Sequence, residues 1–333
     1  MRKSKDPDIS HIALASQEIS KRLHAGMLII LQSTTYPGTT EDLIDHVVRE
    51  EGYEPGKDVF ICFSPERVDP GNKGYGLGNT PRVVGGITPE CTRRGVDFWS
   101  NVVSEVVPVS SSRVAEMVKL LENTFRASNI GLVNEMAVMC ERMGIDVWEV
   151  IDAAATKPFG FMPFYPGPGI GGHCIPLDPM YLAWKAKAYG FFNRFIELAG
   201  EINGNMPRYI VMKVHEALNL CGKAPRGSSV LILGVAYKRD VADLRESPGI
   251  EILRLLRAEG ARADFNDPLV PQLSEAEEVL SSVSLTEQFL SSYDCVLLVT
   301  DHSSYDYRFI AASSRLVVDT RNAFRGIPGH FES

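Results

Sequence analysis

The sequence predicts an α/β protein in which two parallel-sheet domains are joined by a helical central domain. Three observations lead to this prediction. Short, continuous apolar runs alternate with helical patterns in the first third of the chain and again in the last third, as in parallel sheets covered on both faces. Between them, helical periodicity extends from residue 113 to about 220. The length of 333 residues suits two or three domains.

The first domain is expected over residues 1–110. Its predicted strands are 27–31, 59–63 and 105–109, and its predicted helices are 9–23, 41–51 and 89–101. The first two strands are unbroken apolar runs, which favours strands buried on both faces of a sheet. This pattern predicts a parallel, doubly covered sheet.

The helical central domain is expected over residues 111–220. Apolar residues occupy almost every face of the stretch 113–144, which predicts a helix that is buried or packs against a partner on several sides. A shorter helix is predicted at 147–155, and a helical connection begins at Met180. Between them lies a loop rich in glycine and proline, residues 157–179.

The third domain is expected over residues 221–333. Its predicted strands are 230–233, 263–265, 295–299 and 316–319. Ser247 as N-cap, Pro248 in the first turn and Gly260 at the end bracket a helix between the first two strands. Strand and helix alternation therefore predicts a second parallel sheet.

Composition and charge exclude several classes of protein. The net charge of -8, from 34 basic and 42 acidic residues, gives no general attraction to nucleic acid or to anionic membranes. No apolar run approaches the roughly 18–20 residues that span a bilayer, and no apolar stretch follows the basic start to make a secretion signal. The six cysteines are far apart, which disfavours zinc and disulfides and favours a reducing cytoplasm.

One glycine-rich string matches a dinucleotide-binding motif only by its letters. Residues 167–172 read Gly-Pro-Gly-Ile-Gly-Gly, which satisfies G-x-G-x-x-G. A dinucleotide turn follows a strand and opens a helix. Prolines precede this string and Cys174-Ile175-Pro176 follows it, so we do not interpret it as that motif.

Two patterns are candidates for chemistry. Cys174 lies in this glycine-proline loop, a poor place for core packing; it is either a nucleophile or a small buried hydrophobe, and the neighbouring His173 is either its base or a scaffold residue. Lys119 and Asn123 are four residues apart and share a face of an apolar helix. Lys119 is either a proton shuttle or oxyanion partner, or a lysine that reaches solvent at the helix edge.

Polar groups also follow the predicted strands. Thr34 and the run 64–67 (Ser-Pro-Glu-Arg) come directly after strands, where α/β sheets place ligands, although turn chemistry alone explains them equally well. In the third domain the basic residues that follow strands are Lys238, Arg239, Arg245 and Arg321. They suit an anionic ligand, and the alternative is solvated surface charge.

Together these motifs resemble the UDP-glucose/GDP-mannose dehydrogenase family of nucleotide-sugar 6-dehydrogenases. The stretches Phe63–Asn72 (FSPERVDPGN) and Lys157–Gly169 (KPFGFMPFYPGPG) are most similar to the UDP-N-acetylglucosamine 6-dehydrogenase branch. Leu177 and Pro70 replace a lysine and an acid of the UDP-glucose enzymes, which also fits the N-acetylhexosamine branch. The resemblance covers essentially the whole chain.

The resemblance implies NAD-dependent oxidation of the C6 hydroxyl of UDP-N-acetylglucosamine (UDP-GlcNAc) to a uronic acid, through a cysteine thiohemiacetal and thioester. It implies that Cys174 is the catalytic thiol and that Glu66 acts in thioester hydrolysis. The other catalytic positions that it implies are Lys119, Asn123, Asp178 and Thr34. The implied UDP-sugar contacts are Arg67, Tyr165, Gly169, Gly171, Tyr237, Lys238 and Arg321, and the implied NAD contacts are Arg245, Thr34 and Cys174. A homodimer serving polysaccharide biosynthesis is also implied.

The sequence departs from the family at its start. Family members begin with a strand, a G-x-G-x-x-G turn and a helix, whereas this chain begins after them, near Asp6-Pro7-Asp8. We therefore expect two Rossmann-like domains, of which the N-terminal one is incomplete. Two readings compete with an active dehydrogenase: a catalytically silent, dimeric remnant that binds UDP-sugar, and a cysteine hydrolase or acyltransferase unrelated to NAD.

Overall fold

A computed structural model describes residues 8–69, 71–72, 74–275, 278–329 and 331–332, so the start of the chain near Asp6-Pro7 and the predicted specificity position Pro70 lie outside the described residues. By its contacts the chain divides into two compact units. Unit one comprises Met1–Arg126 and Leu177–Glu197, and unit two comprises Ala127–Pro176 and Leu198–Ser333. The three domain boundaries expected from the sequence stay a prediction.

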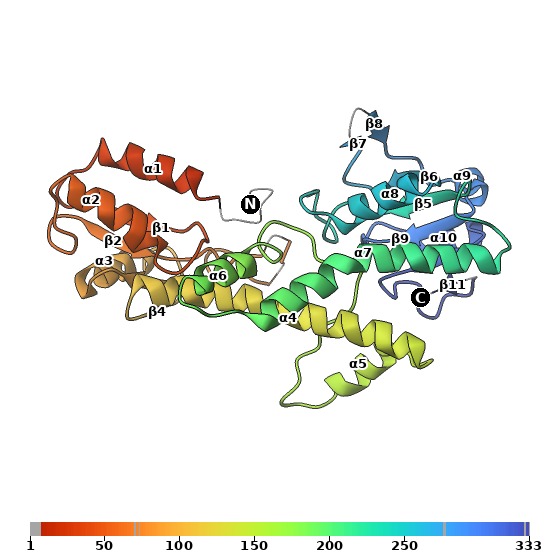
Figure 1. The fold of residues 1–333 in the computed structure, drawn as a ribbon, viewed down its shortest axis with the longest axis horizontal. Coiled ribbons are helices and arrows are strands. Elements are labelled where there is room, and N and C mark those ends of the chain that lie inside the picture. The colour runs from red at the N-terminus through yellow and green to blue at the C-terminus, as the bar shows by residue number, and fades with distance from the viewer. Residues whose placement is uncertain (1–7, 70, 73, 276–277, 330, 333) are drawn as a thin grey trace. The chain divides into compact units, whose positions relative to one another are not determined.

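Unit one contains a four-stranded sheet in the order β1-β2-β3-β4. The strands β1, β2 and β4 of this sheet are labelled in Figure 1. The strands are β1 (Leu28–Leu31), β2 (Phe60–Phe63), β3 (Arg82–Gly86) and β4 (Val106–Pro108). The pairs β1–β2 and β3–β4 are parallel, whereas β2–β3 is antiparallel. The three predicted strands are confirmed. The prediction of a purely parallel sheet is wrong, because the strand β3, which the sequence did not predict, pairs antiparallel with β2.

The strand β3 is buried although its sequence lacks the apolar pattern of a buried strand. It reads Arg-Val-Val-Gly-Gly, with a charged first residue and only two large apolar side chains, yet all five residues are buried. The Arg82 guanidinium lies 4.2 Å from the centre of the Trp99 ring, which gives the charged residue an aromatic neighbour in place of water. A buried arginine of this kind has no signature in hydrophobic periodicity.

Helices cover both faces of this sheet. The helical segment predicted at 41–51 is confirmed and begins as a π-helix, η1 (Thr40–Asp45), that continues as α2 (His46–Glu50). Its Ile44 and Val48 pack with Ile61 of β2 on one face of the sheet. On the other face α3 (Pro89–Trp99) packs against Cys62. The remaining helices of unit one include α1 (Ser10–Ser20) and α6 (Asp178–Lys187).

Two long helices have residues in both units, namely α4 (Ser112–Arg142) and α7 (Arg194–Leu220). The long helix expected at 113–144 is confirmed. Its apolar side chains differ in exposure, since Leu120 is fully buried whereas Leu121 is 63% exposed. Neither these helices nor the other described ones combine the length and apolarity that crossing a membrane requires.

Unit two contains a parallel five-stranded sheet in the order β11-β10-β9-β5-β6. The strands β5, β6, β9 and β11 of this sheet are labelled in Figure 1. Its strands are β5 (Ser229–Leu233), β6 (Arg262–Asn266), β9 (Cys295–Leu298), β10 (Val317–Asp319) and β11 (Phe331–Glu332). Val230 and Ile232 of β5 pack with α7 and α8 (Pro248–Ala258) on one face. Leu231 and Leu233 pack with α9 (Glu287–Ser292) and α10 (Tyr307–Ser313) on the other face. This alternation explains the continuous apolar run that predicted β5.

The helices around this sheet agree with the sequence pattern in part. The helix α8 (Pro248–Ala258) is capped by Ser247, whose hydroxyl accepts the Gly249 N–H, as predicted. The helix α5 (Val147–Ala155) is also as predicted. The elements of this domain that the sequence did not predict are α9 (Glu287–Ser292), α10 (Tyr307–Ser313), the edge strand β11, and the antiparallel pair β7 (Gln272–Glu275) and β8 (Glu278–Ser281).

Candidate active site

In unit one the polar residues predicted from strand ends lie at one edge of the sheet. The strands β1 and β2 are parallel neighbours, and the Ser64 N–H donates to the Leu31 carbonyl at 2.9 Å where both strands end. Thr34 follows β1 and is half-buried, and Glu66 follows β2. The carboxyl edge of parallel strands is where α/β sheets bind ligands.

A buried arginine connects these two strand ends. The Arg82 guanidinium donates to both carboxylate oxygens of Glu66, at 3.0 and 3.1 Å, and to the Gln32 side chain. The Arg82 side chain is 2% exposed, whereas that of Glu66 is 49% exposed. Glu66 is therefore an anchored carboxylate with one side open to solvent, and Arg82 is a site residue that the sequence reasoning missed together with β3.

The hydrogen bonds of Glu66 decide its charge. Partial burial alone would raise the pKa of Glu66, but hydrogen bonds from the Val68 N–H and from Arg82 outweigh burial and hold the pKa below its usual range. The neighbouring Arg67 is held differently, because its guanidinium donates to Glu122 at 2.7 Å and to the Pro81 carbonyl at 2.7 Å. The predicted contact of Arg67 with substrate stays a prediction.

The helix α4 presents Asn123 to a buried carboxylate. The Asn123 amide donates to Asp178 at 2.5 Å, and both residues are buried. Burial raises the pKa of Asp178 to about 6, although the Asn123 hydrogen bond and the charge of Lys119 act in the opposite direction. The structure thus brings Asn123 and Asp178 together, and Lys119 is near enough to influence the same carboxyl group.

One helical turn before Lys119, Glu116 fixes the loop that follows Thr34. Its buried carboxylate accepts the Gly38 N–H at 2.5 Å, and accepts the Thr40 N–H and hydroxyl at 2.9 and 2.7 Å. A carboxylate suits this place because the first N–H groups of a helix lack intrahelical partners. The available sequence signal for Glu116 was its spacing of three residues from Lys119.

In unit two the glycine string is a place of close packing. A Cβ atom on Gly167 would lie 2.5 Å from an Arg321 nitrogen, and one on Gly171 would collide with the Tyr237 Cβ. The backbone N–H of Gly172 donates to the Arg245 carbonyl at 2.9 Å. Residues 161–174 contain no strand or helix, so this string lacks the strand-turn-helix context of a dinucleotide turn.

Cys174 lies on this loop with an exposed side chain, and all six cysteines are thiols. Arg245 is close enough for its charge to interact with Cys174, and a cation favours the reactive thiolate form of a cysteine. The Arg245 guanidinium is exposed and is oriented by Asp243, which it contacts at 2.6 Å. The exposure of Cys174 excludes the alternative of a small buried hydrophobe, and its role as a nucleophile stays a prediction.

The other predicted substrate residues of unit two lie on this loop itself or on the segments that follow β5 and β10. The Tyr165 hydroxyl donates to Asp152 at 3.0 Å, and its ring stacks on Trp148. Arg321 donates to the Val299 carbonyl at 2.8 Å, and burial lowers its pKa. A cavity of about 380 Å³ borders Gly167, and another of about 370 Å³ borders Gly169. Lys238 lies on the loop between β5 and α8.

Three family descriptions match successive parts of the chain. The NAD binding domain of the UDP-glucose/GDP-mannose dehydrogenase family matches residues 1–103, its central domain matches 113–205, and its UDP binding domain matches 231–326. The chain therefore belongs to the UDP-glucose/GDP-mannose dehydrogenase family. These matches confirm the predicted class, an NAD-dependent UDP-sugar dehydrogenase.

Two curated enzymes and one solved structure are similar to this chain over most of its length. A UDP-N-acetyl-D-glucosamine 6-dehydrogenase of Pseudomonas aeruginosa is 35% identical over 306 residues, which are 90% of this chain and 71% of that protein. A UDP-N-acetyl-D-mannosamine dehydrogenase of Salmonella typhimurium is 34% identical over 96% of this chain and 78% of its own length. The solved structure of a UDP-D-ManNAc dehydrogenase from Pyrococcus horikoshii matches with a TM-score of 0.88 at 30% identity, over 99% of this chain and 78% of its own.

The comparisons bear on the expected truncation. Since the NAD binding domain of the family matches from residue 1, they do not support the expectation that the first half of this domain is missing. Within the described part of unit one, the parallel strands β1 and β2 end at one edge of the sheet, the kind of edge where α/β sheets bind ligands, and the Thr34 side chain that follows β1 carries a hydroxyl. The same described residues contain no strand followed by a glycine-rich turn and a helix that would hold the phosphates.

The buried charge of Asp178 predicts an unusual stability profile. Because its pKa is raised from 3.8 to about 6, the folded state binds more protons than the unfolded state between these values, and stability falls as the pH rises through this window. We expect Asp178→Asn to raise the free energy of unfolding by about 3 kcal/mol at pH 7 and by less than about 1 kcal/mol near pH 4. Denaturant titration at both pH values measures this difference. The exposed Asp97→Asn is the control, and an Asp178→Asn protein no more stable than wild type at pH 7 would contradict the assignment.

Proposed function

We propose that this chain oxidises the C6 hydroxyl of a UDP-N-acetylhexosamine, with UDP-GlcNAc as the favoured substrate, to the carboxylate. The observation that carries the proposal is the buried carboxyl group of Asp178, which accepts a hydrogen bond from the Asn123 amide and whose pKa is lowered by the charge of Lys119. In the chain it follows the exposed thiol of Cys174 by four residues. NAD, when bound, supplies the hydride acceptor for both oxidation steps.

The thiol is needed because an aldehyde must become tetrahedral before its carbon can lose a second hydride. The Cys174 thiolate adds to C6 of the aldehyde, which forms a carbon–sulfur bond and places negative charge on the former carbonyl oxygen. The Lys119 ammonium group and the Asn123 amide stabilise this oxyanion. Loss of hydride from C6 then leaves a thioester on Cys174.

Water releases the acid from the thioester. Asp178, with a pKa of about 6, is ionised at neutral pH and accepts a proton from the attacking water or from Lys119. Glu66 remains anionic through its hydrogen bonds to Arg82 and Val68, and with the Thr34 hydroxyl it orients the water. The carbon–sulfur bond breaks, and the carboxylate leaves while Cys174 returns to a thiolate.

Replacement of the thiol tests this chemistry. We expect Cys174→Ala to reduce uronic acid formation by at least about a thousandfold because no other group forms the thioester, while UDP-sugar affinity changes less than about threefold. Acid formation is measured by product analysis and affinity by calorimetry. The control is Cys221→Ala, which removes another exposed cysteine and is expected to leave turnover unchanged. Normal acid formation by Cys174→Ala would remove the thiol from the mechanism.

Two observations support the proposed substrate, namely the substrates named for similar proteins and the residue at position 177. Relatives at 34–35% identity are named for UDP-N-acetyl-D-glucosamine and UDP-N-acetyl-D-mannosamine. In the chain, Leu177 stands where the resemblance places a lysine in UDP-glucose enzymes. The guanidinium of Arg321 and the ammonium group of Lys238 are the cations proposed to bind the diphosphate.

Comparison of three sugars tests this specificity. We expect kcat/KM for UDP-GlcNAc to exceed that for UDP-glucose by at least about tenfold, because a site formed for the acetamido group is left with unpaired groups when the group is absent. Initial rates of NAD reduction measure it, with UDP-N-acetylmannosamine as the third sugar. Equal efficiency with UDP-glucose would contradict the N-acetylhexosamine assignment.

A second candidate function is a catalytically silent protein that binds UDP-sugar. The observation that favours it is that the described residues of unit one offer no glycine-rich turn for the cofactor phosphates. Calorimetric titration with NAD separates the two functions. Binding of UDP-sugar without any affinity for NAD would establish the silent protein and overturn the proposed dehydrogenase.

We also propose a homodimer, located in the cytoplasm in keeping with the wide spacing of the six cysteines. Met117, Leu121 and Phe125 recur every four residues along α4, and each is more than one-third exposed. A second copy of the chain would cover this stripe. Light scattering of wild-type protein and Leu121→Glu is expected to give a dimer and a monomer, and a wild-type monomer would contradict the proposal.

A further inference from the structure

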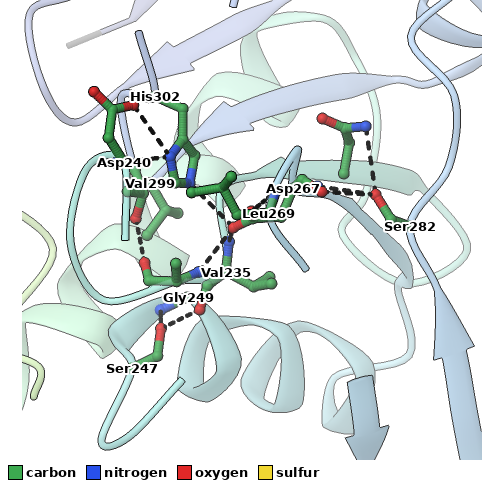
Figure 2. Close-up of polar contacts among 12 residues, drawn as sticks. Val235, Asp240, Ser247, Gly249, Asp267, Leu269, Ser282, Val299 and His302 are labelled. Atoms are coloured by element: carbon green, nitrogen blue, oxygen red, sulfur yellow. Dashed lines mark hydrogen bonds and ion pairs between the residues drawn. The ribbon is translucent and has the colours of Figure 1, made fainter. Parts of the chain in front are cut away.

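The loop that carries Lys238 is held from behind by two buried side chains. Asp267 follows the end of β6 and His302 follows the end of β9, and these two strands flank β5 in the sheet. Both side chains are 0% exposed, and the His302 ring donates from Nε2 to Asp267 at 3.1 Å. Figure 2 shows His302 between Asp240 and Asp267.

Each end of the segment 235–240 is attached to this pair. Asp267 accepts the N–H groups of Val235 and Ala236 at 2.8 and 2.9 Å with the same oxygen that accepts from His302 (Figure 2). At the other end, the Asp240 N–H donates to His302 Nδ1 at 3.0 Å. Since Nδ1 accepts this bond, the ring proton is on Nε2, where it bonds to the carboxylate.

The segment adopts a conformation that needs such support. Asp240 has a φ of 58°, in the left-handed region that residues other than glycine rarely adopt. Its carboxylate accepts the Ser303 N–H at 2.8 Å, so the residue after His302 holds the same turn. The Thr300 hydroxyl donates to the Ala236 carbonyl at 2.6 Å. Lys238 is therefore in the middle of a segment fixed at both ends.

Asp267 is able to serve as a permanent acceptor. Burial alone would raise its pKa, but hydrogen bonds from His302 and from the Ala236 and Leu269 N–H groups outweigh burial and keep the pKa below its usual range. A buried carboxylate with several donors stays ionised and orients them. The pair is thus a fixed support at the ends of two strands.

We propose that the buried His302–Asp267 pair is a positioning element for substrate binding, which holds the segment 235–240 so that Lys238 meets the diphosphate of the UDP-sugar. This inference rests on the proposed function, because it takes Lys238 as a substrate contact. His302 and Asp267 act through the backbone of the segment and are not catalytic residues themselves.

Two replacements of His302 separate its two hydrogen bonds. In His302→Asn the amide oxygen is near the position of Nδ1 and still accepts the Asp240 N–H, whereas in His302→Gln the amide nitrogen reaches toward Asp267 and the acceptor for Asp240 is lost. We expect UDP, titrated by calorimetry, to bind about fivefold more weakly to His302→Gln and within about twofold of wild type to His302→Asn. Wild-type affinity in His302→Gln would overturn the inference.

A double-mutant cycle with Lys238→Ala shows whether His302 acts through the lysine. We expect Lys238→Ala to weaken UDP binding about tenfold, and His302→Gln to add less than about twofold in that background. Independent, additive losses would show that His302 only stabilises the fold, and would overturn the inference while the proposed function stands. Unchanged UDP affinity in Lys238→Ala would remove the substrate role of Lys238 and the inference with it.

Thr300→Val keeps the test decisive should His302→Gln fail to fold. It removes the hydroxyl that bonds the Ala236 carbonyl and leaves the His302–Asp267 pair in place. The same non-additivity with Lys238→Ala is expected, and additive losses would again contradict the inference. Oxidation of UDP-GlcNAc by the wild-type chain is measured in parallel, so that failure of the proposed function is recognised separately.

Discussion

Asp178 is buried at the start of α6, and its burial is the constraint on which the proposed chemistry depends. Removal from water raises the pKa of this carboxyl to about 6, and the amide of Asn123 and the charge of Lys119 keep it from rising further. The same low-dielectric surroundings that make the charge unfavourable strengthen its interaction with a developing oxyanion or a proton. Burial of this carboxyl group therefore lowers the stability of the folded protein at neutral pH, and it provides a group that titrates near neutral pH for the proposed chemistry.

Both units support their strand-end loops in the same physical way. In unit one the guanidinium of Arg82, almost fully buried, joins the ends of β1 and β2 through Gln32 and Glu66. In unit two the pair of Asp267 and His302 joins the loop after β5 to the ends of its neighbours. A buried charge is favourable only when several hydrogen bonds satisfy it, so each charge fixes the surrounding loops in one arrangement.

The sequence predicted most elements of this fold because their apolar periodicity is local. It failed at β3, where two valines between an arginine and two glycines give too short a signal, and at the pair β7–β8. Among the candidate site residues, Lys119 and Asn123 were proposed from their spacing on one helix. Asp178 came only from the family resemblance, because it is 55 residues from Asn123 in the chain.

The residues that were missed share a physical cause. Arg82, Glu116 and His302 act through partners that lie 16, 76 and 35 residues away, and through burial that no spacing reveals. A charged residue in a sequence is most often solvated, so a buried one becomes visible only when its neighbours in space are known.

Mass spectrometry after rapid quenching tests most directly the central claim that Cys174 forms a covalent thioester with the substrate. The protein is mixed with UDP-GlcNAc and NAD, and Glu66→Gln is included because slower hydrolysis lets the covalent intermediate accumulate. The proposed mechanism predicts an acyl adduct on the peptide that contains Cys174, larger in Glu66→Gln than in wild type. Turnover to the uronic acid with no adduct on that peptide in either protein would contradict it.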